Sequence, residues 1–207
     1  MIALARRAKP DDRRAALVEA AAQVLARDGV AGVSVRAIAR AAGVSPGLIG
    51  HYFGGVDALV AEVFAGLGET VDDALDAAIA AAGPAPRDRL AACVTASFAA
   101  PLADADLLGR WIAFWSLTRS HAAVARLHAA QYGAFRRRIA ALLAACGLAP
   151  AEAAREATAL TALVDGLWLE LCLSPGSLPA GEAAALARAA IARIPGFQPA
   201  SCGSSDK

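Results

Sequence analysis

Hydrophobic residues recur every three or four positions along almost the whole chain, a spacing that places them on one face of an α-helix. Leu17, Ala21 and Val24 form the first such set, with polar residues between them. No segment carries a pattern that predicts a strand, and alanine and leucine, which favour helix, dominate the composition. We therefore predict an all-α protein of about nine helices.

Glycines, prolines and short polar residues indicate where these helices begin and end. The first helix stops at Gly29, and the second lies between the capping residue Ser34 and Gly43, with Ile38 on its inward side. Pro46 opens the third helix, where its missing N–H group is not needed. Two short helices joined by a tight turn that contains glycine form a helix-turn-helix, which we place at about residues 34–53.

The third helix is short and has glycines on the side away from the core. Ile49 is predicted to pack inward, with Gly47, Gly50 and His51 on the opposite side. Each exposed glycine weakens a helix by roughly 1 kcal/mol relative to alanine, which is tolerated where another molecule must come close, as in the major groove of DNA. His51 and Tyr52 could then hydrogen-bond phosphates or base edges, and the alternative is that both are ordinary surface residues.

The segment "VSVRAIARAAGVSPGLIGHYFGGVDALVAEVF", residues 33–64, resembles the DNA-binding part of the TetR family of transcriptional regulators. The resemblance implies that this segment contacts phosphates and base edges of operator DNA. The family usually has lysine at the position of Val56, and we expect a basic arm, Arg6 to Arg14, to compensate for its absence. The predicted DNA-binding residues are Ser34, Arg36, Ser45, Pro46, Gly47, Leu48, Gly50, His51 and Tyr52.

The distribution of charge agrees with a polyanionic partner at the N-terminal end. The net charge is only +1, but residues 1–55 hold eight Lys or Arg and four Asp or Glu. A mixed-charge helix exposed to solvent would explain the same composition, so the order of the residues, rather than their number, supports DNA binding.

The remainder of the chain reads as a series of longer helices that form a second domain. A linking helix runs from Asp57 to about Ala82, the next helix spans residues 86–100, and further helices extend to about Arg193. The predicted organisation is a basic flexible arm at 1–10, a helix-turn-helix DNA-binding domain at 11–56, a helical ligand-binding and dimerisation domain at 57–195, and a disordered tail at 196–207.

An aromatic stripe in this second domain suggests a ligand site. Three aromatic residues fall within five positions of one predicted helix, and Trp168 lies near Asp165 on a later one. Ring faces and a carboxylate together attract a cationic ligand, whereas the alternative is that the rings fill the core between helices. The predicted ligand-binding residues are Trp111, Phe114, Trp115, Thr118, Asp165 and Trp168.

The segments "RWIAFWSLTRSHAAVARLHAAQYGAFRRRIAALL" and "LTALVDGLWLELCLSPGSL" resemble the C-terminal domain of the BetI-type subgroup, which regulates choline-to-glycine-betaine genes. The resemblance implies a choline-like, cationic effector. It also implies that the last two helices pair with those of a second copy to form a homodimer, although their apolar faces could serve an intramolecular core instead.

Other function classes lack the residues they need. The four cysteines form no CxxC pair, and no HExxH or GxSxG motif occurs, so we predict no metal, no cofactor and no catalytic residue. No 20-residue apolar run or secretory signal is present, which predicts a cytoplasmic protein without a membrane span. The high alanine and arginine content is typical of a GC-rich bacterial genome.

We predict a homodimeric transcriptional repressor that a small molecule releases from double-stranded operator DNA. The alternative is a helical small-molecule-binding protein or an enzyme without specific DNA binding.

Overall fold

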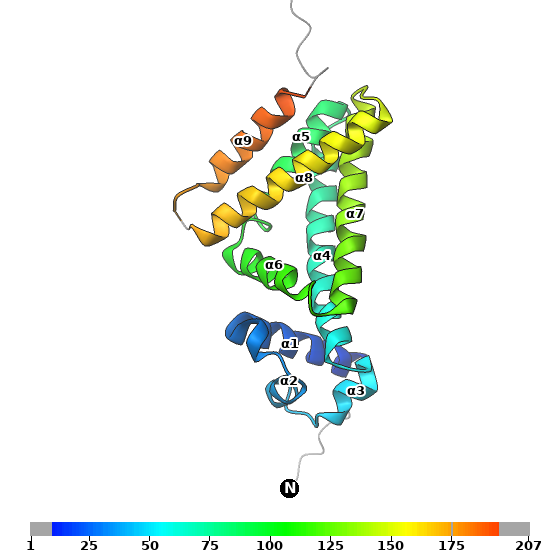
Figure 1. The fold of residues 1–207 in the computed structure, drawn as a ribbon, viewed down its shortest axis with the longest axis vertical. Helices are drawn as coiled ribbons and strands as arrows, with labels where there is room; N and C mark the ends of the chain where they lie inside the picture. The colour runs from blue at the N-terminus through cyan, green and yellow to red at the C-terminus, as the bar shows by residue number, and fades with distance from the viewer. Residues whose placement is uncertain (1–9, 175, 195–207) are drawn as a thin grey trace, which may run out of the picture. The chain divides into compact units, whose positions relative to one another are not determined.

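The computed structural model describes residues 10–174 and 176–194, and in these ranges the chain forms nine helices (Figure 1). This confirms the predicted all-α fold. Residues 1–9 of the predicted arm and the predicted tail at 196–207 lie outside the described residues. The helices are α1 (Pro10–Gly32), α2 (Val35–Ala41), α3 (Gly47–Phe53), α4 (Val56–Ala81), α5 (Pro86–Ala96), α6 (Ala105–Leu117), α7 (Ala122–Ala145), α8 (Pro150–Leu173) and α9 (Ala180–Ala192).

The helices pack into two compact units, and α4, α6 and α7 each belong partly to both. Unit 1 comprises Met1–Glu69 and Gly109–Ala129, and unit 2 comprises Thr70–Leu108 and Ala130–Lys207. All residues predicted to contact DNA fall in unit 1. The residues predicted to bind an effector divide between the two units.

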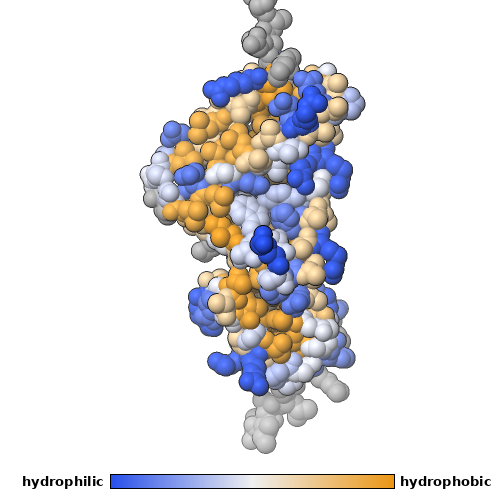
Figure 2. All heavy atoms as spheres, in the orientation of Figure 1, coloured by the Kyte–Doolittle hydropathy of each residue, from blue (hydrophilic) through white to orange (hydrophobic). Residues whose placement is uncertain are grey.

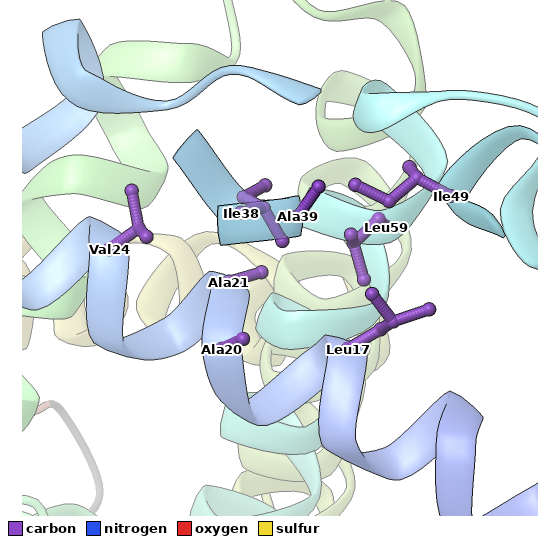
Figure 3. Close-up of a cluster of buried hydrophobic side chains, with 8 residues drawn as sticks. All are labelled: Leu17, Ala20, Ala21, Val24, Ile38, Ala39, Ile49 and Leu59. Carbon is purple, nitrogen blue, oxygen red and sulfur yellow. The ribbon is translucent and has the colours of Figure 1, made fainter. Parts of the chain in front are cut away.

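The core of unit 1 forms where α1, α2, α3 and α4 bring apolar side chains together (Figure 3). Ile38 of α2 and Ile49 of α3 are both fully buried, as their spacing predicted. Burying a side chain of this size stabilises the fold by about 1.5–3 kcal/mol. Because α2 and α3 have only seven residues each, this packing rather than their own helix propensity holds them in place. The cluster consists of Leu17, Ala20, Ala21, Val24, Ile38, Ala39, Ile49 and Leu59.

The ends of α2 and the turn to α3 follow the predicted chemistry. Ser34 has an extended backbone, and its hydroxyl oxygen accepts a hydrogen bond from the backbone N–H of Ala37 at 3.2 Å. Gly43 has a φ of 65°, a conformation that residues with a side chain rarely adopt. The first residue of α3 is Gly47, one position later than predicted, because Pro46 occupies the capping position. Two short helices, α2 and α3, are thus joined by a tight turn that contains Gly43.

In unit 2, α9 packs against α5 and α8, and an arginine ties α7 to α4, which runs beside it (Figure 1). Arg138 Nη1 lies 2.7 Å from Asp72 Oδ1, and Arg138 Nη2 lies 3.1 Å from Asp76 Oδ1. The two carboxylates are one turn apart on α4, so the guanidinium bridges them. Since both aspartates are largely exposed, we expect the pairs to orient the helices more than to stabilise them.

The end of α5 differs from the sequence prediction. We expected this helix to continue to Ala100, but it stops at Ala96 and gives way to turns. The next carbonyl group, that of Ser97, accepts a hydrogen bond from the indole N–H of Trp168 at 2.7 Å. A partner from α8 thus takes the place of a continued helix, which the local sequence could not reveal.

The described residues contain no cluster of three or more His, Cys, Asp or Glu side chains arranged to hold a metal ion. Cys93 is fully buried, and this burial raises the pKa of its thiol to about 12, so it is not a reactive cysteine. Within 10–174 and 176–194, no single helix is long and apolar enough to cross a membrane. The pair α3 and α4, bent by 60° at the break between them, does meet the length and composition criteria together.

Candidate nucleic-acid interface

One side of α3 presents glycine backbone to solvent. Gly47 and Gly50 are exposed, whereas Ile49 between them is fully buried. A Cβ atom added at either glycine would meet no other atom within 4 Å. The backbone of α3 is therefore accessible to another molecule, as the pattern of small residues predicted.

His51 and Tyr52 add polar groups at the end of this helix. Their ring centroids are 5.0 Å apart in an edge-to-face arrangement. His51 is exposed, while Tyr52 is half-buried and packs against the core of unit 1. The two residues therefore differ, because His51 is exposed to solvent and Tyr52 only in part.

The other residues predicted to bind DNA lie on α2, α3 and the turn between them. Ser45, Pro46 and Arg36 are exposed, and Leu48 is half-buried. The hydroxyl of Ser34 accepts the N–H of Ala37, which leaves its own proton available to a phosphate oxygen. The structure thus brings all nine predicted residues into one unit, and their contact with DNA stays a prediction.

Val56 lines a hollow of unit 1 together with a cationic residue that the local sequence did not indicate. Gly55, Asp57 and Arg126 of α7 are among the other residues that line it. Arg126 is exposed and follows Val56 by seventy residues. No local pattern could have linked the two, because they lie on different helices, α4 and α7.

The aromatic stripe of α6 forms a packed cluster in unit 1. Phe114 is fully buried, with its ring centroid 4.7 Å from that of Phe64, 5.1 Å from that of Trp111 and 5.7 Å from that of His128. This arrangement agrees with the packing alternative for Phe114. Trp115 is half-buried, as is Thr118, whose hydroxyl donates to the carbonyl of Trp115 at 2.7 Å.

Asp165 of α8, in unit 2, has a hydrogen-bond partner on α7 that the local sequence does not indicate. The hydroxyl of Tyr132 on α7 donates to Asp165 Oδ1 at 3.0 Å. Burial raises the pKa of the Asp165 carboxyl to about 6, although Tyr132 and the charge of Arg136 act in the opposite direction. A carboxylate in such a place gains from a nearby cation. Nothing in the local pattern around Tyr132 indicated this pairing.

Trp168 has a clear structural role. It is 6% exposed, and its indole N–H donates to the buried carbonyl of Ser97. Phenylalanine at this position would leave that carbonyl without its donor, at a cost of about 1–3 kcal/mol in the free energy of unfolding. We expect urea unfolding of Trp168→Phe to show this loss, and a change below about 0.5 kcal/mol would contradict it.

Comparison with known proteins gives consistent matches along the chain. Residues 17–63 match the family model for bacterial regulatory proteins of the tetR family, and residues 86–196 match the model for the C-terminal domain of BetI-type transcriptional repressors. The HTH-type transcriptional regulator BetI of Burkholderia thailandensis is 35% identical over 177 residues, which cover 84% of this chain and 89% of that protein.

Solved structures agree with these matches. The crystal structure of a transcriptional regulator from Pseudomonas aeruginosa is similar, with a TM-score of 0.81 and 40% identity over 89% of this chain and 91% of that one. A transcriptional regulator from Saccharomonospora viridis, solved in complex with choline, has the same fold. Its TM-score is 0.71 at 22% identity, with 88% of this chain and 97% of that chain covered.

Proposed function

Since the chain belongs to the TetR family of bacterial regulatory proteins and carries a BetI-type C-terminal domain, we propose that α3 is the helix with which it binds operator DNA. The protein is a ligand-responsive, DNA-binding transcriptional repressor and not an enzyme. Because its target is double-stranded DNA, we place its activity in the cytoplasm of a bacterium.

The proposed DNA face is the exposed side of α3 that contains Gly47 and Gly50. It is supported by the open space over these two glycines. The N-terminal residues of a recognition helix approach base edges in the major groove, and Gly47 is the first residue of this helix. Ser45 and His51 are exposed nearby and offer hydrogen-bonding groups for base edges, while Ser34, Arg36 and Tyr52 suit phosphates.

Leucine in place of Gly47 tests this proposal. The new side chain meets nothing within 4 Å in the free protein, so we expect thermal stability to be kept or slightly raised. In the complex it would occupy space needed by the DNA, and we expect affinity to fall at least about tenfold. Fluorescence anisotropy measures this with a labelled duplex from the region upstream of the protein's own gene.

Gly66→Leu on α4 is the matched control, because Gly66 is exposed and a Cβ there also meets no atom within 4 Å. We expect Gly66→Leu to bind the duplex like the wild type. Equal affinity of Gly47→Leu and wild type, or equal wild-type affinity for a scrambled duplex, would contradict the proposed DNA face.

We also propose that the protein is a homodimer built through α8 and α9. Most exposed positions of α8 carry small or apolar residues, Arg155 and Glu170 being charged, and a Cβ added at Gly166 would meet nothing within 4 Å. The exposed large hydrophobic residues found in the described part of the chain are Leu169 and Leu173 of α8 and Leu186 of α9. Figure 2 shows hydrophobic residues gathered over these helices. A second copy is the occupant that fits, because two DNA-binding heads must act together on a two-fold operator.

For the effector we propose a small cation of the choline class. The half-buried, hydrogen-bonded carboxyl of Asp165 supports a cationic ligand, since a bound positive charge would offset the cost of keeping it ionised. Of the six residues predicted for the site, Asp165 in unit 2 therefore carries the proposal, whereas Phe114 and Trp168 pack inside the protein. The predicted residues of α6, which are Trp111, Phe114, Trp115 and Thr118, belong to unit 1.

A further inference from the structure

Arg14, near the start of α1, contacts the C-terminal end of α3 and also the next helix, α4. Its Nε donates to Glu62 Oε1 on α4 at 2.9 Å, and its Nη2 is paired with Glu62 Oε2. Its Nη1 donates to the backbone carbonyl of Tyr52 at 2.9 Å. The guanidinium also lies over the ring of Phe53, 4.5 Å from the ring centroid. One side chain therefore joins three helices of unit 1.

These contacts supply what α3 lacks at its end. The last carbonyl groups of a helix have no donor within the helix, and the carbonyl of Tyr52 is one of them. Arg14 gives it a charged donor, and Glu62 holds the guanidinium in a two-bond arrangement that only arginine can form. Because α3 is too short to be stable alone, its direction depends on such contacts together with the buried side chain of Ile49.

We propose that Arg14, held by Glu62, is a positioning residue for α3, and that it supports DNA binding through the orientation of this helix rather than through a phosphate. The inference rests on the proposed role of α3 in binding DNA. It also separates Arg14 from the predicted basic arm, Arg6 to Arg14, because Arg14 lies within α1 and its guanidinium is already bound to Glu62 and Tyr52.

Glu62→Gln gives the sharpest test. A purely electrostatic role and a positioning role of Glu62 predict opposite changes in DNA affinity. Removing a negative charge from a DNA-binding unit should strengthen DNA binding if only long-range attraction matters. If Glu62 holds Arg14, the same change should weaken binding, and we expect a loss of about fivefold. Glu69→Gln is the matched control, because it removes the same charge from an exposed position of the same helix.

Arg14→Lys provides the second arm of the experiment, since it keeps the positive charge and loses the two-bond contact with Glu62. We expect it to weaken binding like Glu62→Gln, while the slope of log affinity against log salt stays at the wild-type value. Arg14→Gln removes the positive charge as well. If Arg14 only positions α3, this variant keeps the wild-type salt slope, whereas the loss of a phosphate contact would lower the slope by about 0.9.

All variants are measured by anisotropy on the duplex used for Gly47→Leu, at a temperature where each is folded by circular dichroism. Weakening by Glu62→Gln and Arg14→Lys with an unchanged salt slope supports the proposal. Binding by Glu62→Gln that equals or exceeds that of Glu69→Gln overturns it. The proposed function fails separately, because in that case Gly47→Leu would also leave the affinity unchanged.

Discussion

Arginine in place of Ala162 is expected to convert the protein into a monomer and to weaken its binding to operator DNA by at least about a thousandfold. Ala162 is exposed in the middle of α8, on the same side as Gly166 and Leu169. Where two helices pack through small residues, a long charged side chain separates their backbones and places a charge where it has no partner. A monomer presents one recognition helix, so it can contact only one half-site of a two-fold operator.

Sedimentation equilibrium measures the first effect, and anisotropy with the upstream duplex measures the second. Wild-type protein should have twice the mass of one chain, and Ala162→Arg should have the mass of one chain. Ala141→Arg on α7 is the matched control, since Ala141 is also exposed on a long helix but lies outside the proposed dimer face. A dimeric Ala162→Arg variant with unchanged DNA affinity would refute the placement of the interface on α8.

The local organisation of the DNA-binding unit could be predicted from the sequence because its signals are local. The inward positions of Ile38 and Ile49 follow from helical spacing, and the cap at Ser34 follows from the residue type. The end of α2 at Gly43, which has a positive φ, could likewise be predicted from the residue type. Such signals act within a few residues, so they fix helices and turns without knowledge of the packing.

Pairings between helices could not be predicted in the same way. Arg14 meets Glu62 across 48 positions, and Tyr132 meets Asp165 across 33. These contacts depend on the angles at which helices cross, which periodicity alone does not determine. The same limit applies to Phe114, whose place in the stripe was compatible with a ligand cage or a core until the surrounding rings were known.

The affinity for choline is expected to be constant above about pH 7 and to fall about tenfold by pH 5, because the proposed site pairs the cation with the ionised form of Asp165. The pKa of this carboxyl is raised to about 6 in the folded protein, so its charge is lost as the pH falls through that value. Isothermal titration at pH 5, 6, 7 and 8 measures the effect. The uncharged analogue 3,3-dimethylbutanol should bind without this pH dependence, since it makes no ion pair.

Asp165→Asn should bind choline at least about tenfold more weakly at pH 8 and should lose the pH dependence. Unfolding of the variant would not explain weaker binding, because we expect Asp165→Asn to be no less stable than the wild type at this pH. A carboxyl whose folded pKa lies above its usual 3.8 stabilises the protein only when protonated, and that contribution is lost as the pH rises through about 6. Asp165→Asn should therefore be at least as stable as wild type at pH 8, and the asparagine oxygen can still accept from Tyr132.

Tyr132→Phe distinguishes the effect of the Asp165 charge on choline binding from the effect of its hydrogen bond with Tyr132. The variant keeps the negative charge, so choline should still bind at pH 8. The hydroxyl of Tyr132 lowers the pKa of Asp165, and without it the midpoint of the pH dependence should move upward. Unchanged choline affinity in Asp165→Asn would show that another group balances the ligand's charge. Choline binding that is absent in the wild type at every pH would instead refute the choline class.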